Sequence, residues 1–168
     1  MTIYTTIDSP LGELLLVGEE SATAEDGVAL ASLSVPGQRN GTTVQDGWVE
    51  KAEAFSGIAA QLRSYFAGEL TRFDIEFTTG GSEFQRRVWE ALDDIPFGAT
   101  VSYGAVAVRC GASPSAVRAV ASAIGANPLL VVRPCHRVIR SDGTLSGYAG
   151  GPERKRQLLD LESVRQPA

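Results

Sequence analysis

A short polar segment, Thr78-Thr-Gly-Gly-Ser82, separates two parts of the chain that differ in pattern and in charge. Adjacent glycines between small polar residues extend neither a helix nor a strand, so the segment predicts a linker. Residues 1–99 carry 6 Lys and Arg against 16 Asp and Glu, a net charge of −10, whereas residues 100–168 carry 9 against 4, a net of +5. We therefore expect two domains, 1–77 and 83–168, joined by a linker at 78–82. The positive C-terminal part suits an anionic partner, although chance clustering of charge on solvated faces is the alternative.

The N-terminal part predicts a small α+β domain. Period-two alternation indicates strands, and apolar residues three or four apart indicate a helix. The expected elements are a β-hairpin over Tyr4–Val17, strands over Val28–Val35 and Phe73–Phe77, a helix within Val49–Phe66 and a mobile loop over Pro36–Gly47.

The C-terminal part predicts a helix-turn-helix. Ser82 is placed to cap a helix over Glu83–Asp93. Helices over about Tyr103–Arg109 and Ser113–Gly125 flank a glycine-containing turn, as in a helix-turn-helix, although many helical hairpins in packed cores share this pattern.

The remaining C-terminal residues predict a short β-rich run over Leu129–Val132 and then a wing-like hairpin. In that hairpin Val138–Arg140 would pair with Thr144–Ser146 across a tight turn. Pro152 suits the first position of a last helix that ends near Glu162.

Composition excludes several classes of protein. No apolar run reaches the roughly 18 residues of a transmembrane helix, and the N-terminal residues lack the pattern of a secretory signal, so we expect a cytoplasmic protein with no membrane partner. Two cysteines, Cys110 and Cys135, are too few for a disulfide framework. The single histidine, His136, argues against a zinc site, which takes four ligands, so we expect no metal.

Candidate chemistry gathers around Cys135. A thiol attacks as the thiolate, which nearby cations stabilise and which a neighbouring base can generate. His136 follows Cys135 directly, and the arginines Arg133, Arg137 and Arg140 lie within five residues of it. Adjacency in sequence does not establish contact, and on these residues alone a buried inert cysteine beside a chance histidine is the alternative.

Pro134-Cys-His-Arg-Val138 resembles the active-site signature of the O6-alkylguanine-DNA alkyltransferases, also called methylated-DNA–protein-cysteine methyltransferases. Further motifs follow in that family's order: Phe84-Gln-Arg-Arg-Val-Trp89, Ile95-Pro-Phe-Gly98, Ser102-Tyr-Gly104, Ala116-Val-Arg-Ala-Val120, Asn127-Pro128, Gly147-Tyr148, Gly150-Gly151 and Leu158-Leu159 through Glu162. The resemblance covers residues 82–162 closely and 1–77 loosely. It implies an α+β protein with a small N-terminal α/β domain, ribonuclease H-like, followed by a C-terminal winged helix-turn-helix domain.

The resemblance implies DNA repair by a direct, stoichiometric and irreversible transfer of the alkyl group from O6-alkylguanine, with O4-alkylthymine as a further candidate substrate. Cys135 would accept the alkyl group and keep it. His136 would act as its base through a bound water, and Glu162 would orient and charge the histidine. Asn127 would hold the active-site turn, and Tyr103 would donate a proton or a hydrogen bond to the leaving guanine ring.

The resemblance also implies how the base is held. An O6-alkyl group lies within the base stack, so the nucleotide must be flipped out of the duplex. Tyr148 would form part of the pocket wall. The backbone carbonyls of Cys135 and Val138 would contact the exocyclic amine, and the amide near Ala149 would approach O6. Arg118 would fill the space that the flipped nucleotide leaves.

The helix over Ser113–Gly125 would enter the minor groove, where small residues permit close approach. Besides Arg118, the residues expected to meet DNA are Ser113, Ala119, Ser122 and Ala123. Binding should depend mostly on phosphate contacts and be sensitive to salt. We expect a monomer that binds double-stranded DNA carrying O6-alkylguanine and uses no cofactor.

Three positions depart from the family pattern. Arg133 stands where many relatives carry an aliphatic residue, Leu130 stands where some place a proline, and Cys110 stands where an aliphatic residue is common. We interpret Cys110 as a small core residue.

Three alternative functions compete with the alkyltransferase. A lesion-binding relative without repair activity usually lacks the acceptor cysteine and the N-terminal domain, and this chain has both. A winged-helix regulator would not need Cys135, His136, Asn127 and Glu162 together. A cysteine hydrolase would turn over repeatedly, whereas water does not cleave the thioether of an alkylated cysteine.

Overall fold

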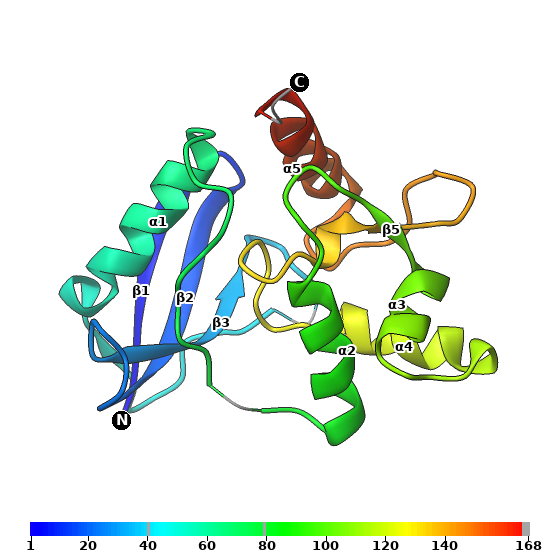
Figure 1. The fold of residues 1–168 in the computed structure, drawn as a ribbon. Helices are drawn as coiled ribbons and strands as arrows, with labels where there is room; N and C mark the ends of the chain where they lie inside the picture. Colours follow the sequence, from blue (N-terminus) through cyan, green and yellow to red (C-terminus); the bar gives the residue numbers. More distant parts are fainter. Residues whose placement is uncertain (40, 79, 166–168) are drawn as a thin grey trace. The chain divides into compact units, whose positions relative to one another are not determined.

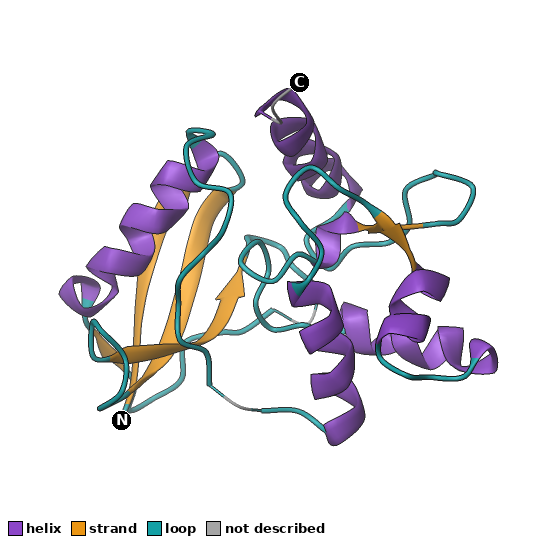
Figure 2. Ribbon diagram, viewed as in Figure 1, coloured by secondary structure: helices purple, strands orange, loops and turns teal. Residues whose placement is uncertain are grey.

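The computed structural model describes residues 1–39, 41–78 and 80–165. The chain divides into two compact units, Met1–Thr79 and Gly80–Ala168. The first unit contains a sheet and one long helix, whereas the second is mainly helical (Figure 1, Figure 2). No helix within the described residues is both long enough and apolar enough to cross a membrane.

The first unit is built on a four-stranded sheet with the order β3-β2-β1-β4. Strands β1 (Thr2–Ser9) and β2 (Gly12–Glu20) form the predicted hairpin, and β3 (Val28–Ser34) pairs antiparallel with β2. The short strand β4 (Val49–Glu50) runs parallel to β1 and begins the segment that we predicted to be helical. The helical part starts later than expected, because β4 pairs before it.

Helix α1 (Ser56–Phe66), which follows the 3-10 helix η1 (Ala52–Phe55), lies along one face of the sheet (Figure 1). Its buried residues include Ile58, Leu62 and Tyr65, whose spacing places them on one side of the helix. They meet a sheet whose buried side chains are mostly leucines and valines, so this core follows from the alternation in the sequence.

The strand predicted over Phe73–Phe77 does not form. The segment makes only a single parallel bridge, between Phe77 and Leu30. The Gln61 side chain pairs with the backbone of Asp74 instead, accepting from its N–H at 2.8 Å and donating to its carbonyl at 2.9 Å. Backbone groups that already hydrogen-bond a side chain need no partner strand, so the alternation of apolar residues was not enough to predict a strand here.

The second unit begins with α2 (Glu83–Asp93), which has the predicted bounds. Ser82 Oγ accepts from the Gln85 backbone N–H at 3.1 Å, and the Gln85 side chain accepts from the Ser82 backbone N–H at 3.0 Å. This reciprocal capping box fixes where the helix starts.

Helices α3 (Tyr103–Arg109) and α4 (Val117–Gly125) pack against each other and against α2 in the helix-turn-helix (Figure 1). The second helix was predicted to start at Ser113, but its first turn is the 3-10 helix η2 (Pro114–Ala116), and α-helical geometry begins only at Val117. The last helix, α5 (Pro152–Arg165), starts as predicted and continues past Glu162.

The predicted wing hairpin is wrong in its pairing. Strand β6 (Val138–Ile139) pairs in parallel with β5 (Val101–Ser102), and residues 144–146 form no strand. The predicted turn between Arg140 and Thr144 does form, and a hydrogen bond from the Arg140 N–H to the Thr144 carbonyl closes it at 3.1 Å. Beyond it, Lys155 Nζ of α5 donates to Ser146 Oγ at 2.8 Å, and this bond holds the returning segment against the last helix.

Candidate active site

Cys135 begins a one-turn 3-10 helix, η3 (Cys135–Arg137), directly before β6. The residues Leu129–Val132, predicted as a β-rich run, form a tight turn, in which the Val132 N–H donates to the Leu130 carbonyl at 2.8 Å. Val131 has φ 70° there, a conformation that is unfavourable for a β-branched residue. Such strain, roughly 1–3 kcal/mol, persists only where the surrounding structure enforces it. The surrounding structure therefore holds this turn in place, and the turn sets the position of the chain just before Cys135.

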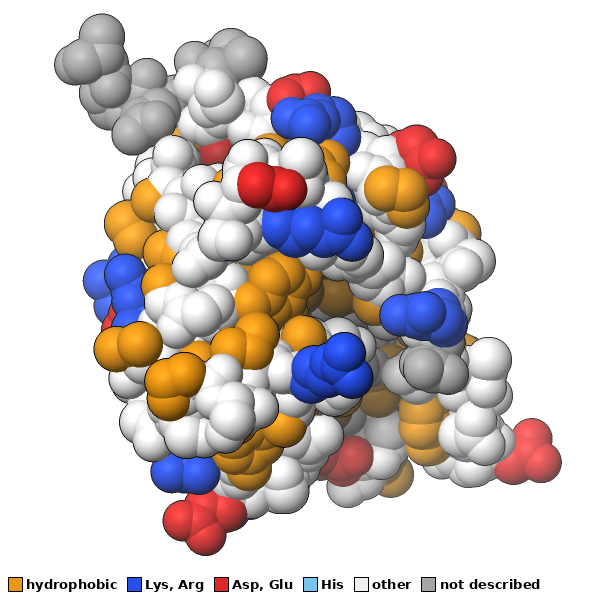
Figure 3. All heavy atoms as spheres, turned by 90° about the vertical axis from the view of Figure 1, so that its right-hand side faces the viewer, with side chains coloured by type: hydrophobic (Ala, Val, Ile, Leu, Met, Phe, Trp, Pro, Cys, Tyr) orange, Lys and Arg blue, Asp and Glu red, His pale blue; other side chains and the backbone are white. Residues whose placement is uncertain are grey.

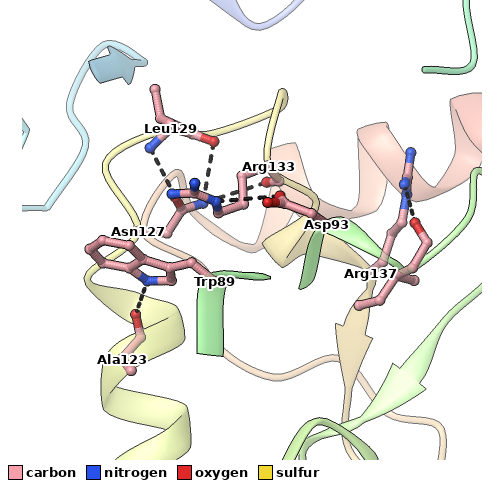
Figure 4. A network of polar contacts seen from close by, with 8 residues as sticks. Trp89, Asp93, Ala123, Asn127, Leu129, Arg133 and Arg137 are labelled. Carbon is pink, nitrogen blue, oxygen red and sulfur yellow. Dashed lines mark hydrogen bonds and ion pairs between the residues drawn. The ribbon is translucent and has the colours of Figure 1, made fainter. Parts of the chain in front are cut away.

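Asn127, which follows α4, braces this turn. Its Oδ1 accepts from the Leu129 N–H at 3.0 Å, and its Nδ2 donates to the Leu129 carbonyl at 3.2 Å (Figure 4). The Asn127 Nδ2 also donates to the Arg133 carbonyl at 3.5 Å, and this carbonyl accepts from the Cys135 N–H at 2.8 Å. Asn127 thus braces both the turn and the backbone next to Cys135.

His136 is fully buried and its Nε2 lies 2.7 Å from Glu162 Oε2, a residue 1% exposed on α5. Arg137 also binds this carboxylate, with Nε 2.8 Å from Oε1 and Nη2 2.9 Å from Oε2, and its Nη1 donates to the Ile95 carbonyl at 2.6 Å. Because Nε2 faces a carboxylate, it carries the imidazole proton, and Nδ1 holds the basic lone pair. Nδ1 is buried and has no hydrogen-bond partner among the described residues.

Burial and charge set the protonation states of this site. Burial raises the pKa of the Cys135 thiol, and the polar Asn127 side chain and the charges of Lys155 and Arg133 only partly oppose it. Burial lowers the pKa of His136, against the opposing pull of Glu162. Burial alone would raise the pKa of Glu162, but the hydrogen bonds and charges of His136 and Arg137 lower it to about 2. The site at rest therefore holds a thiol, a neutral imidazole and a carboxylate.

A second hydrogen-bonded chain reaches the site from α5. The Tyr103 hydroxyl contacts Ser146 Oγ, and Lys155 Nζ donates to Ser146 Oγ at 2.8 Å and to the Val138 carbonyl at 2.7 Å. Lys155 is completely buried, and burial lowers the pKa of its ammonium to about 8. Tyr103 directly follows β5, so the parallel β5–β6 pair aligns it with the segment that carries Cys135.

The loop that carries the predicted pocket residues contacts this chain, because Lys155 Nζ also donates to the Gly147 carbonyl at 3.4 Å. Tyr148 and Ala149 are half-buried in the loop before α5. Val138 is buried, and its carbonyl, predicted to contact the exocyclic amine, already accepts from Lys155. A carbonyl oxygen has two lone pairs, so capacity for one more donor is left.

The helix-turn-helix presents most of the predicted DNA contacts to solvent. Arg118, Ser113, Ala119 and Ser122 are exposed, whereas Ala123 is only 3% exposed. The Ala123 carbonyl accepts from Trp89 Nε1 at 2.8 Å (Figure 4), so this residue belongs to the face that packs against α2 and is not part of a DNA surface. Figure 3 views the side on which α3 and α4 lie in Figure 1, and Lys and Arg side chains are spread over it among acidic, uncharged and apolar ones.

Sequence reasoning missed Lys155 and Ser146 and misjudged Arg137. Lys155, Leu158 and Glu162 are all buried at helical spacing on α5, so the buried face of the helix was a signal for Lys155. No sequence signal distinguished Ser146 from other loop residues. Arg137 was expected to stabilise a thiolate, but its guanidinium is committed to Glu162 and the Ile95 carbonyl.

Comparison with known proteins bears directly on this site. The ribonuclease-like domain of 6-O-methylguanine DNA methyltransferase matches residues 2–79, and the DNA binding domain of the same family matches residues 83–164. The methylated-DNA–protein-cysteine methyltransferase of Mycolicibacterium paratuberculosis is 49% identical over 168 residues, which cover 100% of this chain and 96% of that protein. The chain belongs to the 6-O-methylguanine DNA methyltransferase family.

Solved structures of the family agree. The crystal structure of Mycobacterium tuberculosis OGT in complex with DNA matches with a TM-score of 0.86 and 49% identity, covering 99% of this chain and 96% of that one. The O6-methylguanine-DNA methyltransferase of Pyrococcus kodakaraensis, at 22% identity and a TM-score of 0.66, shares the fold. The predicted family, the α+β fold with its two domain types, and the enzyme class at the level of the family are confirmed. The roles of single residues stay predictions.

Proposed function

We propose that this family member repairs DNA by moving the alkyl group of O6-alkylguanine in double-stranded DNA onto Cys135, which keeps it. The observation that carries the proposal is the arrangement at the start of η3. There Cys135, whose N–H donates to a carbonyl that Asn127 also binds, is followed by a buried imidazole whose Nε2 is 2.7 Å from Glu162. A cysteine that served only as a small apolar core residue would not need a buried acid–base pair next to it.

His136 is the proposed base. Its lowered pKa keeps it neutral at rest, and Nδ1, which has no partner among the described residues, is available to take the thiol proton through a bridging water. Glu162, ionised because its pKa is about 2, then stabilises the imidazolium. The new S–C bond forms as the bond between the alkyl carbon and O6 breaks, and the electron pair of that bond stays on the guanine.

Tyr103 is the proposed donor to the guanine ring as the ring gains negative charge. The contact with Ser146, and through it with Lys155, supports this role. Lys155 Nζ can only donate, so the Ser146 oxygen accepts from it and the Ser146 hydroxyl proton can be donated to the Tyr103 oxygen. The Tyr103 proton is then available for the guanine ring. A lysine with a pKa of about 8 can also replace the proton that is lost.

DNA binding is assigned to the C-terminal domain, residues 83–168, with residues 78–82 as the linker from the N-terminal domain over 1–77. The exposed positions Arg118, Ser113, Ala119 and Ser122 would face the duplex, and Arg118 would occupy the space of the flipped nucleotide. The protein would act as a monomer, because each chain carries its own complete set of residues for one transfer.

The proposal is tested with duplex DNA that carries a single radiolabelled O6-methylguanine. Wild-type protein and Cys110→Ser should take up the label, because Cys110 is a half-buried thiol whose Sγ contacts the Ala107 carbonyl. Cys135→Ser should take up none while its binding to the same duplex is retained. Binding without uptake by the wild type would instead support the lesion-binding protein, and uptake by Cys135→Ser would contradict the assignment of the acceptor.

A further inference from the structure

Arg133, two residues before Cys135, lies almost entirely inside the second unit. The residue is 8% exposed. Its guanidinium carbon is 5.2 Å from the centroid of the Trp89 ring, and its Nε is 3.4 Å from Asp93 Oδ1 at the end of α2. Burying a guanidinium costs free energy unless it is paired, and here Asp93 and the Trp89 ring offset part of that cost.

The third contact of the guanidinium reaches the acceptor site. Arg133 Nη1 donates to Asn127 Oδ1 at 3.4 Å (Figure 4). The same oxygen accepts from the Leu129 N–H, so two donors converge on Oδ1. A guanidinium can only donate, and it therefore favours the amide orientation that turns Nδ2 toward the Arg133 carbonyl, 3.5 Å away, which in turn accepts from the Cys135 N–H at 2.8 Å.

We propose that Arg133 is a positioning residue for the alkyl acceptor: held by Asp93 and Trp89, it keeps the Asn127 amide directed at the carbonyl that accepts from the Cys135 N–H, and it adds positive charge beside the nascent thiolate. The inference rests on the proposed function, in which Cys135 is the acceptor. It assigns Asp93 a definite part as well, because this carboxylate holds Arg133 in place and offsets part of its charge.

The charges around Cys135 define what a pH measurement would detect. Lys155 and Glu162 face the site from α5, His136 and Arg137 belong to η3, and Arg133 lies in the preceding loop with Asp93 behind it on α2. Arg137 and Glu162 largely neutralise each other. The positive charges that favour the thiolate are therefore those of Lys155 and Arg133.

The test measures the rate of benzyl transfer from free O6-benzylguanine as a function of pH, which leaves DNA binding out. In Arg133→Met the rising limb of the rate profile should move to higher pH by about half to one unit, and the rate at neutral pH should fall about three- to tenfold, since one pKa unit changes the thiolate fraction tenfold. Arg133→Lys should restore part of this shift, because it keeps the charge but loses the planar contact with Trp89 and Asn127.

Asp93→Asn should shift the pH profile in the direction opposite to that of Arg133→Met. Asparagine keeps an oxygen that can accept from Arg133 Nε but removes the negative charge, so Arg133 stays in place with more positive potential and the rising limb should move to lower pH. Arg87→Met is the matched control, because Arg87 is an exposed arginine of α2 that also lies over an aromatic ring, 5.7 Å from the Phe84 centroid. Its profile should equal that of the wild type.

Slower transfer in both Arg133→Met and Asp93→Asn with an unmoved pH profile would overturn the inference, because a role in packing alone predicts that result. Shifts of the same sign in both variants would overturn it too. A wild-type protein that takes no benzyl group on Cys135 would overturn the proposed function, whereas a wild type that does so with an unchanged Arg133→Met profile would overturn this inference alone.

Discussion

Replacing Glu162 by glutamine should destabilise the second unit strongly. Glu162 is 1% exposed and accepts three charge-assisted hydrogen bonds, one from His136 at 2.7 Å and two from Arg137 at 2.8 and 2.9 Å. Glutamine has one acceptor oxygen and an NH2 group that would face another donor. The change also leaves the Arg137 guanidinium, 6% exposed, without its counter-charge.

The magnitude follows from two observations. Removing one partner of a buried ion pair costs about 3–5 kcal/mol. Lowering the pKa of Glu162 from 4.5 to about 2 corresponds to about 3 kcal/mol of stability at neutral pH. Because the folded state lowers this pKa, the stability is present above pH 4.5 and is lost as the pH falls from about 4.5 toward 2. The difference between wild type and Glu162→Gln should shrink over that interval.

Urea unfolding in a Trp48→Phe background measures this cost, since Trp89, 7% exposed in the second unit, is then the only tryptophan that reports. Asp160→Asn is the control on the same helix. Asp160 makes an exposed pair with Arg156 at 3.9 Å, and such pairs contribute roughly 0–1 kcal/mol. If Glu162→Gln lost no more stability than Asp160→Asn, the account of the buried cluster would be wrong.

Three further substitutions have expected effects of stated direction on the transfer rate or on stability. Arg118→Ala should slow transfer from duplex DNA and leave transfer from free O6-benzylguanine unchanged, with Arg72→Ala, an exposed arginine of the first unit, as control; equal losses on both substrates would refute the role in base flipping. Ser146→Ala, which separates Tyr103 from Lys155, should slow transfer about three- to tenfold without weakening DNA binding, and a wild-type rate would exclude the Lys155–Ser146–Tyr103 chain. Gly81→Ala should lower the stability of the second unit by about 1–3 kcal/mol, because Gly81 has φ 81° and a Cβ there would lie 2.7 Å from the Trp89 ring. Gly80→Ala, with open space around the added methyl, should be nearly neutral in thermal unfolding, and equal effects of the two would contradict this packing.

The sequence predicted best those elements whose signals are local. Ser82 and Gln85 form a capping box three residues apart, so the start of α2 could be predicted from the chain. The strands were predicted less well, because a strand needs a partner that the pattern does not identify. Phe73–Phe77 alternates as a strand should, yet Gln61 takes up the backbone of Asp74.

The site shows the same division. The bond between His136 and Glu162 spans 26 residues of sequence, and no periodicity links them, so their pairing came from the family resemblance alone. Lys155 and Ser146 were missed because their roles arise from where α5 and its preceding loop pack. Arg133 could be recognised as unusual from the sequence, but only the structure shows it between Trp89, Asp93 and Asn127.

The central claim is a single, permanent transfer to one thiol, and intact-protein mass spectrometry with peptide mapping tests it most directly. After incubation with excess duplex DNA that carries one O6-methylguanine, each chain should gain the mass of one methyl group, located on Cys135, and should gain no more with time. A methyl group on Cys110, a gain beyond one equivalent, or an unmodified protein that turns the lesion over repeatedly would each contradict the account.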